Sequence, residues 1–185
     1  PIYKAKGECF LRGWREKNYT IVRPAITYSK RRCQLINLER PQIFGAIKKG
    51  EPIVLCREAM NVQATMSWAG DVAEMLARLF FNSAALGEDF NVTTAEHRTW
   101  GEIAGYYAEI FGAKFEIADK EAYLTARNGG KPCEKWQRWQ LDYDRLFHRV
   151  MDNSKILAAT GLKQSEFTSI REGLAREQNT LKDDL

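Results

Sequence analysis

The sequence predicts an α/β fold, in which helices and short strands alternate along the chain. A helical pattern over residues 1–16 leads directly into the β-branched run at 19–22, and the segment 70–112 reads as helix, strand and helix. With 185 residues, 44% of them hydrophobic, the chain is long enough for one domain with a buried core. We therefore expect a sheet whose faces are covered by helices.

The first elements are a helix and a strand. Gly7 and Gly13 weaken the helix at 1–16 because glycine has a low helix propensity, and Pro24 stops the strand at 19–22. Residues 25–40 follow no clear period, and we interpret their basic stretch at 29–32 as a solvated loop. The next expected elements are a helix at 42–49 that Gly50 closes, a strand at 52–56 and an extended stretch at 60–68.

The segment 70–112 has the clearest punctuation in the chain. Asp71 is predicted to cap the first helix, and Thr99 with Glu102 forms a capping box for the second, which Gly112 ends in a left-handed conformation. A brief strand at 89–92 lies between them. The apolar face of the first helix is expected to comprise Val72, Met75, Leu76, Leu79 and Phe80.

The remaining third of the chain is mostly helical. An edge strand is expected at 114–118, and Asp119 is expected to cap a helix that runs to residue 126. An aromatic-rich helix is predicted over 134–150, followed by one that residues 152–154 cap and Gly161 ends, and by a final amphipathic helix at 167–178. The aromatic stripe of the 134–150 helix is predicted to face the core; it comprises Trp136, Trp139, Tyr143 and Phe147.

Composition narrows the class of protein. The net charge of +4 comes from 28 basic and 24 acidic residues that are mixed along the chain, so we expect an ordinary solvated surface and no nucleic-acid partner. No apolar run reaches the length of a membrane span and no signal peptide is visible, which predicts a cytoplasmic protein with reduced thiols and no membrane partner. The four cysteines are too widely spaced for a zinc site, so no metal is expected.

Five short motifs resemble one enzyme family when they are taken in order. They are Arg-Pro at 23–24 with Tyr28, DVA at 71–73, FNV at 90–92, TWGE at 99–102 and DNSK at 152–155. This order is similar to that of the NAD-dependent epimerase/dehydratase family, the extended short-chain dehydrogenases. The resemblance covers nearly the whole chain but only the later part of the family's length. The glycine-rich turn G-x-G-x-x-G that would hold a dinucleotide does not occur in the chain.

The resemblance implies the C-terminal part of a Rossmann-type doubly wound sheet plus a smaller mixed α/β substrate-binding lobe. Residues 1–29 and about 68–92 would belong to the nucleotide-binding fold, and about 30–67 and 93–185 mainly to the lobe. The main binding half for NAD or NADP would precede residue 1, so this chain alone should bind cofactor poorly. We therefore expect a preceding half in a longer polypeptide, a separate partner or self-association to complete the sheet.

The same resemblance implies a catalytic Tyr with a Lys four residues later on one helix. The Lys and the nicotinamide ribose lower the pKa of the phenol, so that it can exchange a proton while hydride moves. Lys6 matches the Lys, but Ile2 stands at the Tyr position; Tyr3, three residues back, is rotated by about 60° on the helix. Either Tyr3 substitutes through a distorted first turn, or the acid/base group is lacking. A plain surface role is the alternative for both Tyr3 and Lys6.

The resemblance also indicates where ligands bind. Lys6 and Pro24 would contact the cofactor, and Tyr28, Arg31, Arg32 and Arg145 would contact the substrate. Nucleotide-sugar enzymes of this family usually carry an Arg seven residues before the DVA Asp, where this chain has Ala64. We therefore expect an epimerase, dehydratase or reductase that transfers hydride to or from a sugar-like hydroxyl or carbonyl substrate. The alternative is a non-catalytic NAD(P)-binding or regulatory relative.

Overall fold

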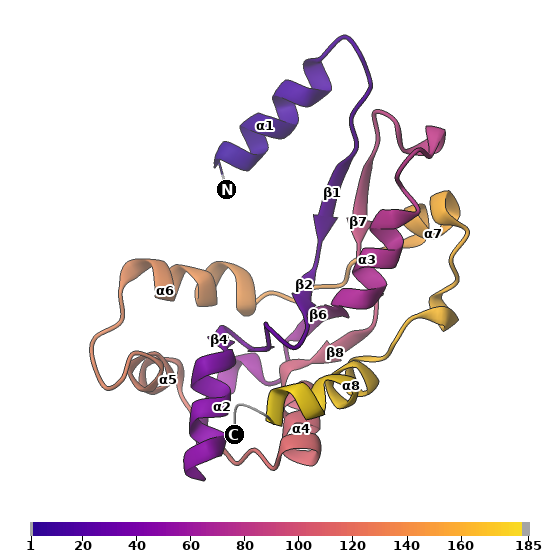
Figure 1. The fold of residues 1–185 in the computed structure, drawn as a ribbon. Coiled ribbons are helices and arrows are strands. Elements are labelled where there is room, and N and C mark those ends of the chain that lie inside the picture. Colours follow the sequence, from indigo (N-terminus) through magenta and orange to yellow (C-terminus); the bar gives the residue numbers. More distant parts are fainter. Residues whose placement is uncertain (1, 183–185) are drawn as a thin grey trace.

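A computed structural model describes residues 2–182 of the chain (Figure 1). Its α-helices are α1 (Ile2–Gly13), α2 (Arg40–Lys49), α3 (Ala69–Ala77), α4 (Trp100–Phe111), α5 (Lys120–Arg127), α6 (Lys135–Gln140), α7 (Ser154–Thr160) and α8 (Ile170–Lys182). Its strands are β1 (Ile21–Pro24), β2 (Ile26–Tyr28), β3 (Gln34–Leu35), β4 (Leu38–Glu39), β5 (Ile53–Cys56), β6 (Gln63–Trp68), β7 (Asp89–Val92), β8 (His97–Thr99) and β9 (Phe115–Ala118). Four short turns complete the list: the 3₁₀ turns η1 (Arg57–Ala59), η2 (Ser83–Ala85) and η4 (Gln164–Glu166), and the π-helical turn η3 (Leu141–Arg145).

Most strand pairs are parallel. β1 runs parallel to β7 with Ile21 opposite Asp89, and β5 runs parallel to β9. The chain passes from β1 into β2, which is parallel to β6, while β8 joins the other edge of β6 in the antiparallel direction. β3 and β4 form a small hairpin. The predicted α/β class, with parallel strands and covering helices, is confirmed.

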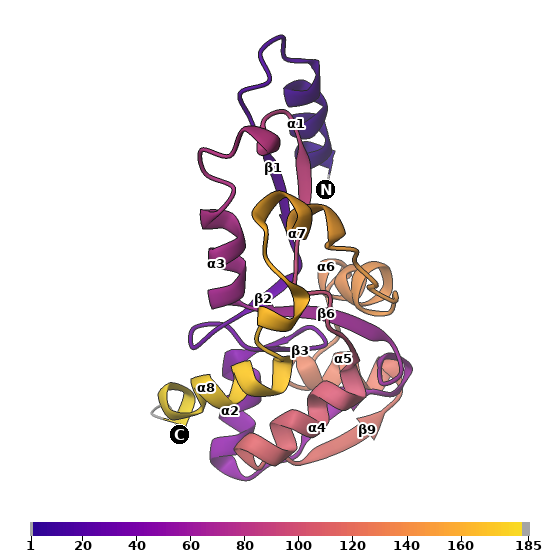
Figure 2. The same ribbon diagram turned by 90° about the vertical axis from the view of Figure 1, so that its right-hand side faces the viewer.

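The molecule has an upper arm and a lower lobe (Figures 1 and 2). The upper arm contains α1, β1, β7, α3 and α7, and the lower lobe contains the remaining strands with α2, α4, α5, α6 and α8. The arm has a small apolar cluster between α3, β7 and α7, centred on Met75, Phe90 and Ile156. No helix in the described part of the chain is both long and apolar enough to cross a membrane.

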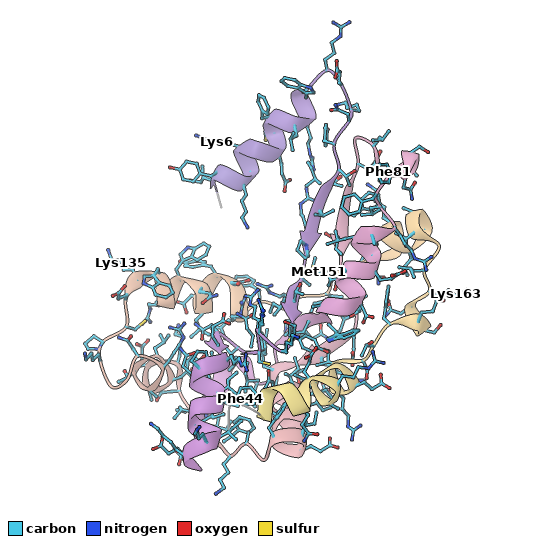
Figure 3. The ribbon with its side chains drawn as sticks, viewed as in Figure 1. Lys6, Phe44, Phe81, Lys135, Met151 and Lys163 are labelled. Atoms are coloured by element: carbon cyan, nitrogen blue, oxygen red, sulfur yellow. The ribbon has the colours of Figure 1, made fainter. Side chains whose placement is uncertain are left out.

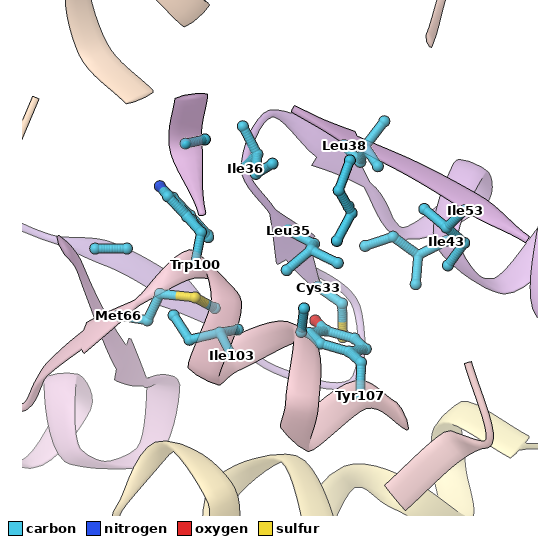
Figure 4. Close-up of a cluster of buried hydrophobic side chains, with 14 of the residues drawn as sticks. Cys33, Leu35, Ile36, Leu38, Ile43, Ile53, Met66, Trp100, Ile103 and Tyr107 are labelled. Carbon is cyan, nitrogen blue, oxygen red and sulfur yellow. The ribbon is translucent and has the colours of Figure 1, made fainter. Parts of the chain in front are cut away.

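The larger apolar cluster lies in the lower lobe and is organised around α4. Trp100, Ile103 and Tyr107 project from one face of α4 toward the β3–β4 hairpin (Figure 4). The Tyr107 hydroxyl donates a hydrogen bond to the Gln34 carbonyl oxygen over 3.3 Å, which fixes the hairpin against the helix. This burial is the main stabilising feature of the lobe because apolar area removed from water contributes about 25 cal/mol per Å².

Several predicted helix ends are confirmed. The Glu102 backbone N–H donates to the Thr99 hydroxyl over 3.1 Å, and the Thr99 N–H donates to the Glu102 carboxylate over 2.8 Å, so the capping box is complete. The Asp119 carboxylate accepts from the Ala122 N–H. Gly112 and Gly161 both adopt the left-handed conformation, at φ 70° and 71°.

The cap predicted for Asp71 is wrong. α3 begins at Ala69, so Asp71 lies inside the first turn, and its carboxylate accepts the Thr168 N–H over 2.9 Å. Burial raises the pKa of Asp71. Phe80 is also not part of the apolar face, because α3 ends at Ala77 and 73% of the Phe80 side chain is exposed.

Other predicted boundaries shift. α1 ends at Gly13, and β1 starts two residues later than expected and includes Pro24. The region at 25–40, which lacked a clear period, holds three strands of two or three residues each, too short for a periodic signal. The predicted helix at 134–150 is interrupted: α6 gives way to the π-helical turn η3 at residue 141, and the segment after Arg145 is not helical.

Candidate functional site

The two catalytic candidates lie on the N-terminal half of α1, in the upper arm. Tyr3 is 88% exposed and Lys6 is also exposed, and none of the residues of α1 is buried. Residues three apart on a helix are neighbours on its surface, so Tyr3 and Lys6 share one side of α1. Figure 3 shows Lys6 on this projecting helix.

Charged side chains attach α1 to the sheet. The Arg23 guanidinium on β1 donates to the Glu8 carboxylate over 2.6 and 3.1 Å and to the Asp89 carboxylate over 2.5 Å. Arg12 on α1 also donates to the Asp89 carboxylate, over 3.0 Å. The hydrogen bonds from Arg23 hold the pKa of both carboxyl groups below their usual range. The position of α1 therefore depends on charges and not on apolar packing.

The carboxyl ends of β1 and β7 meet a buried polar cluster. Pro24 is exposed and stands opposite Val92 at the end of the ladder. Just beyond Val92, the hydroxyls of Thr93 and Thr94 lie 3.2 and 3.3 Å from the Ser67 hydroxyl on β6. The cluster joins the arm's sheet to the lobe's sheet at the place where ligands bind in open α/β sheets.

Tyr28 is placed in the core. Only 1% of its side chain is exposed, and its hydroxyl donates to the Ile170 carbonyl oxygen over 3.2 Å. Burial, with the negative charge of Glu96, raises the pKa of Tyr28 well above its ordinary value. The phenol therefore stays neutral and joins β2 to the start of α8.

The three arginine candidates differ in their surroundings. Arg31 and Arg32 are exposed in a tight turn that two backbone hydrogen bonds between Ser29 and Arg32 close, over 2.9 and 3.0 Å. Arg145 is 4% exposed, and its guanidinium donates to the Ile36 carbonyl oxygen over 2.8 Å. Burial lowers the pKa of Arg145 to about 10, so it remains charged at neutral pH.

These candidates do not form one cluster. Tyr3, Lys6 and Pro24 belong to the upper arm, whereas Tyr28, Arg31, Arg32 and Arg145 belong to the lower lobe. Arg145 supports Ile36, a β-branched residue at φ 58° in the turn between β3 and β4. Such a residue rarely adopts positive φ, so the buried guanidinium stabilises an unfavourable turn.

The prediction that the α6 aromatic residues face the core is wrong. Trp136, Trp139, Tyr143 and Phe147 are 60%, 49%, 66% and 59% exposed. A second stripe, made of charged residues at positions 138, 142, 145 and 149, has the same helical spacing, and this charged side faces the protein. The sequence carries no local signal for this orientation, because a charged stripe ordinarily faces water.

No protein-family model matches the sequence, and no curated protein sequence matches it. Solved structures do match. The UDP-glucose 4-epimerase of Thermotoga maritima, solved with UDP-glucose, has a TM-score of 0.69 at 19% identity, over 99% of this chain and 53% of its own. An epimerase from Methanothermobacter thermautotrophicus has a TM-score of 0.70 at 15% identity, over 99% of this chain and 49% of its own. RMD from Pseudomonas aeruginosa, complexed with NADPH, has a TM-score of 0.67 at 15% identity, over 100% of this chain and 55% of its own.

The chain has a Rossmann-like α/β fold that is similar to the folds of these proteins. At these identities the likeness concerns the fold alone, and it extends over the whole chain. The chain spans about half the length of the solved chains it matches.

Proposed function

We propose that this chain forms the later part of an NAD(P)-dependent epimerase, dehydratase or reductase that acts by hydride transfer on a sugar-like hydroxyl or carbonyl substrate. The observation that carries the proposal is a match over 99–100% of this chain that covers only 49–55% of the matched chains. A complete epimerase fold therefore contains about as much additional chain as is present here.

The unpaired edge of β1 is an argument for a further strand in the complete protein. Among the described residues, only β7 pairs with β1, so the other edge of β1 has no partner strand. Val22 at the centre of β1 is 39% exposed, and α1 beside it buries no residue. Parallel strands normally lie inside sheets that helices cover on both faces. The completing strand would come from the preceding half of a longer polypeptide, from a separate partner or from a second copy.

In the complete enzyme, Tyr3 and Lys6 would act as a pair. A bound nicotinamide supplies the acceptor or donor of hydride. The Tyr3 phenol would exchange the proton with the substrate oxygen, and Lys6 would hold the ribose and the phenol in place. Their exposure on one side of α1 fits this role, although they are three residues apart and not four.

The test uses the polypeptide extended before residue 1. It is expected to bind NADH or NADPH, as measured by nicotinamide fluorescence and calorimetry, and to transfer hydride to a sugar substrate. Tyr3→Phe is expected to reduce the rate by about 10²- to 10⁴-fold, the usual contribution of a general acid or base, without weakening cofactor binding. Tyr19→Phe, a change at a partly exposed tyrosine just before β1, is the matched control. An extended polypeptide that binds neither cofactor contradicts the proposal.

A non-catalytic relative is the second candidate, and Ile2 favours it because this residue stands four positions before Lys6, where the family has its Tyr. The extended polypeptide would then bind NAD(P) and remain inactive over a broad panel of sugars and carbonyl compounds. Tyr3→Phe would change neither binding nor stability. Measurable turnover that depends on Tyr3 would exclude this candidate.

A further inference from the structure

The segment 146–153, which we call the strap, connects η3 in the lower lobe to α7 in the upper arm (Figure 1). Its residues are all described, and they form neither helix nor strand. The end of the strap nearest α7 is bound to β7 and to the residue that follows it. The Asn91 side-chain amide donates to the Asp152 carbonyl oxygen over 3.1 Å, and the Asn153 amide donates to the Thr93 carbonyl oxygen over 3.0 Å. The strap therefore joins the two parts of the molecule.

The other end of the strap lies along one edge of β6, and β8 occupies the opposite edge. The Arg149 N–H donates to the Gln63 carbonyl oxygen over 3.1 Å, and the Gln63 N–H donates to the His148 Nδ1 atom over 3.2 Å. The Thr65 hydroxyl also donates to the Arg149 carbonyl oxygen. The strap thus pairs with β6 as a short strand would, except that a side chain supplies the acceptor for the Gln63 N–H.

The two histidines of the chain contact this region in opposite ways. The Nε2 atom of His97 on β8 lies 3.3 Å from the Met151 carbonyl oxygen. A carbonyl oxygen only accepts, so this Nε2 carries a proton. The Nδ1 atom of His148 accepts from a backbone N–H, so it carries none. A second proton on the ring therefore leaves the His97 bond intact and removes the His148 bond.

The groups around His148 do not reproduce this sensitivity. β6 carries no titratable side chain at 63–68. Apart from His97, the charged residues on η3, on the strap and on or next to β8 are paired with one another: Arg149 with Asp144, and Arg98 with Glu96 and Glu102. The other contacts of the strap described above use backbone, hydroxyl or amide groups, which do not titrate near neutral pH. Among those contacts, a proton therefore changes only that of His148.

We propose that His148 is a pH-sensitive latch, which fastens the strap to β6 when its ring is neutral and releases this end of the strap when its ring is protonated. Imidazole is the side chain whose charge ordinarily changes between about pH 5 and pH 8. Protonation places an N–H group against the Gln63 N–H, so an attractive contact becomes repulsive. The contacts of the strap with His97 and β7 are kept. The strap therefore loosens at the lobe and stays attached to the arm, whether or not the chain takes part in hydride transfer.

The experiment measures hydrogen exchange of the Gln63 backbone amide by NMR in the full chain, corrected for the intrinsic rate. This N–H is the donor to His148, so its protection reports the latch directly. Protection of Gln63 is expected to fall by about threefold to tenfold between pH 8 and pH 5, the usual net effect of one hydrogen bond. The Trp100 amide, which donates to the Val62 carbonyl oxygen over 3.1 Å at the start of the β8 edge, is the internal control and should be unchanged.

Three variants separate the two histidines. His148→Asn keeps an acceptor oxygen near the position of Nδ1 and does not titrate, so Gln63 should be equally protected at pH 8 and pH 5. His148→Ala removes the acceptor, so protection should be low at both pH values. His97→Gln keeps a donor near the position of Nε2 and is the matched control, in which the response of Gln63 to pH should persist.

Four results would overturn the inference. They are equal protection of Gln63 at pH 8 and pH 5 in the unaltered chain, a fall that persists in His148→Asn, a fall that disappears in His97→Gln, and undiminished protection in His148→Ala.

Discussion

α1 and α4 are both 12 residues long, and both carry aromatic and aliphatic side chains, but their surroundings are opposite. α4 buries five residues against the strands of the lower lobe, whereas α1 buries none. α4 also has a complete capping box and a left-handed glycine at its end, while α1 depends on ion pairs to Arg23 and Asp89. The difference teaches that apolar burial holds α4 in place, whereas charged contacts hold α1 in the described structure.

The largest expected effect comes from the core of α4. Trp100→Ala should lower the free energy of unfolding by about 3–5 kcal/mol, because it leaves a cavity at a side chain that is 1% exposed. Phe10→Ala on α1, where the ring is 64% exposed, should change it by less than about 0.5 kcal/mol. Urea unfolding monitored by circular dichroism measures both. Comparable losses in the two variants would show that α1 has a buried apolar contact in solution.

An intermediate effect is expected at Asp71, whose buried carboxylate links α3 to the start of α8. Asp71→Ala should cost about 1–3 kcal/mol, because it leaves the buried Thr168 N–H without an acceptor. Asp71→Asn keeps an acceptor oxygen and should be at least as stable as the unaltered chain at neutral pH. Denaturant titrations of the two variants at pH 7 separate the hydrogen bond from the charge.

The difference in the free energy of unfolding between Asp71→Asn and the unaltered chain should depend on pH, because the Asp71 carboxyl group titrates. Burial raises the pKa of Asp71 in the folded state, so the protonated form is favoured by folding. The stabilising contribution of the protonated Asp71 is complete below the pKa of the group in the unfolded chain, about 3.9. It is lost as pH rises through the pKa of the group in the folded state. The advantage of Asp71→Asn should therefore shrink as pH is lowered toward 4. An advantage that grows on acidification would contradict this assignment.

The smallest effect on global stability is expected from the charges that hold α1. Arg23→Met should leave the midpoint of global unfolding nearly unchanged but accelerate amide hydrogen exchange throughout α1, because the partly buried ion pairs hold α1 and not the core. Arg171→Met removes a more exposed pair with Glu109 on the lobe and is the control. Exchange in α1 that is as slow as in α4 after Arg23→Met would show that the ion pairs do not hold the helix.

Acid should act on the same attachment. Arg23 holds the pKa values of Glu8 and Asp89 low. The ion pairs that attach α1 to the strands are therefore complete at pH values above the ordinary pKa range of carboxyl groups. They are lost as pH falls below about 4, through the lowered folded values. Hydrogen exchange of α1, corrected for intrinsic rates, should therefore become faster relative to that of α4 as pH falls from 5 to 3. Molar salt should also make exchange in α1 faster, because it screens the ion pairs.

The sequence predicted the local features well where they depend on a few neighbouring residues. The Thr99–Glu102 capping box, the Asp119 cap and the left-handed Gly112 follow from short-range geometry, and each is confirmed. Asp71 was misplaced because its partner, Thr168, is 97 residues away in the chain. Long-range pairing of this kind leaves no mark in local periodicity.

The candidate site was less predictable than the fold. Periodicity shows that Trp136 and Tyr143 share a side of a helix, but it does not say whether that side meets the core or water. The orientation is decided by the contacts of Arg145 and Arg138 with the hairpin and α5, which are known only from the tertiary structure. The roles of Tyr3, Lys6 and the arginines stay predictions.

The free edge of β1 bears on how the chain behaves at high concentration. Successive residues of a strand direct their backbone N–H groups to opposite edges. The Ile21 and Ala25 N–H groups donate to the Glu88 and Val92 carbonyl oxygens, so the backbone groups of Val22 and Pro24 face away from β7. Pro24 has no N–H to donate. An added strand therefore finds one backbone donor, that of Val22, within β1. Such an edge offers few donors for edge-to-edge pairing, so Pro24 is expected to limit aggregation through β1.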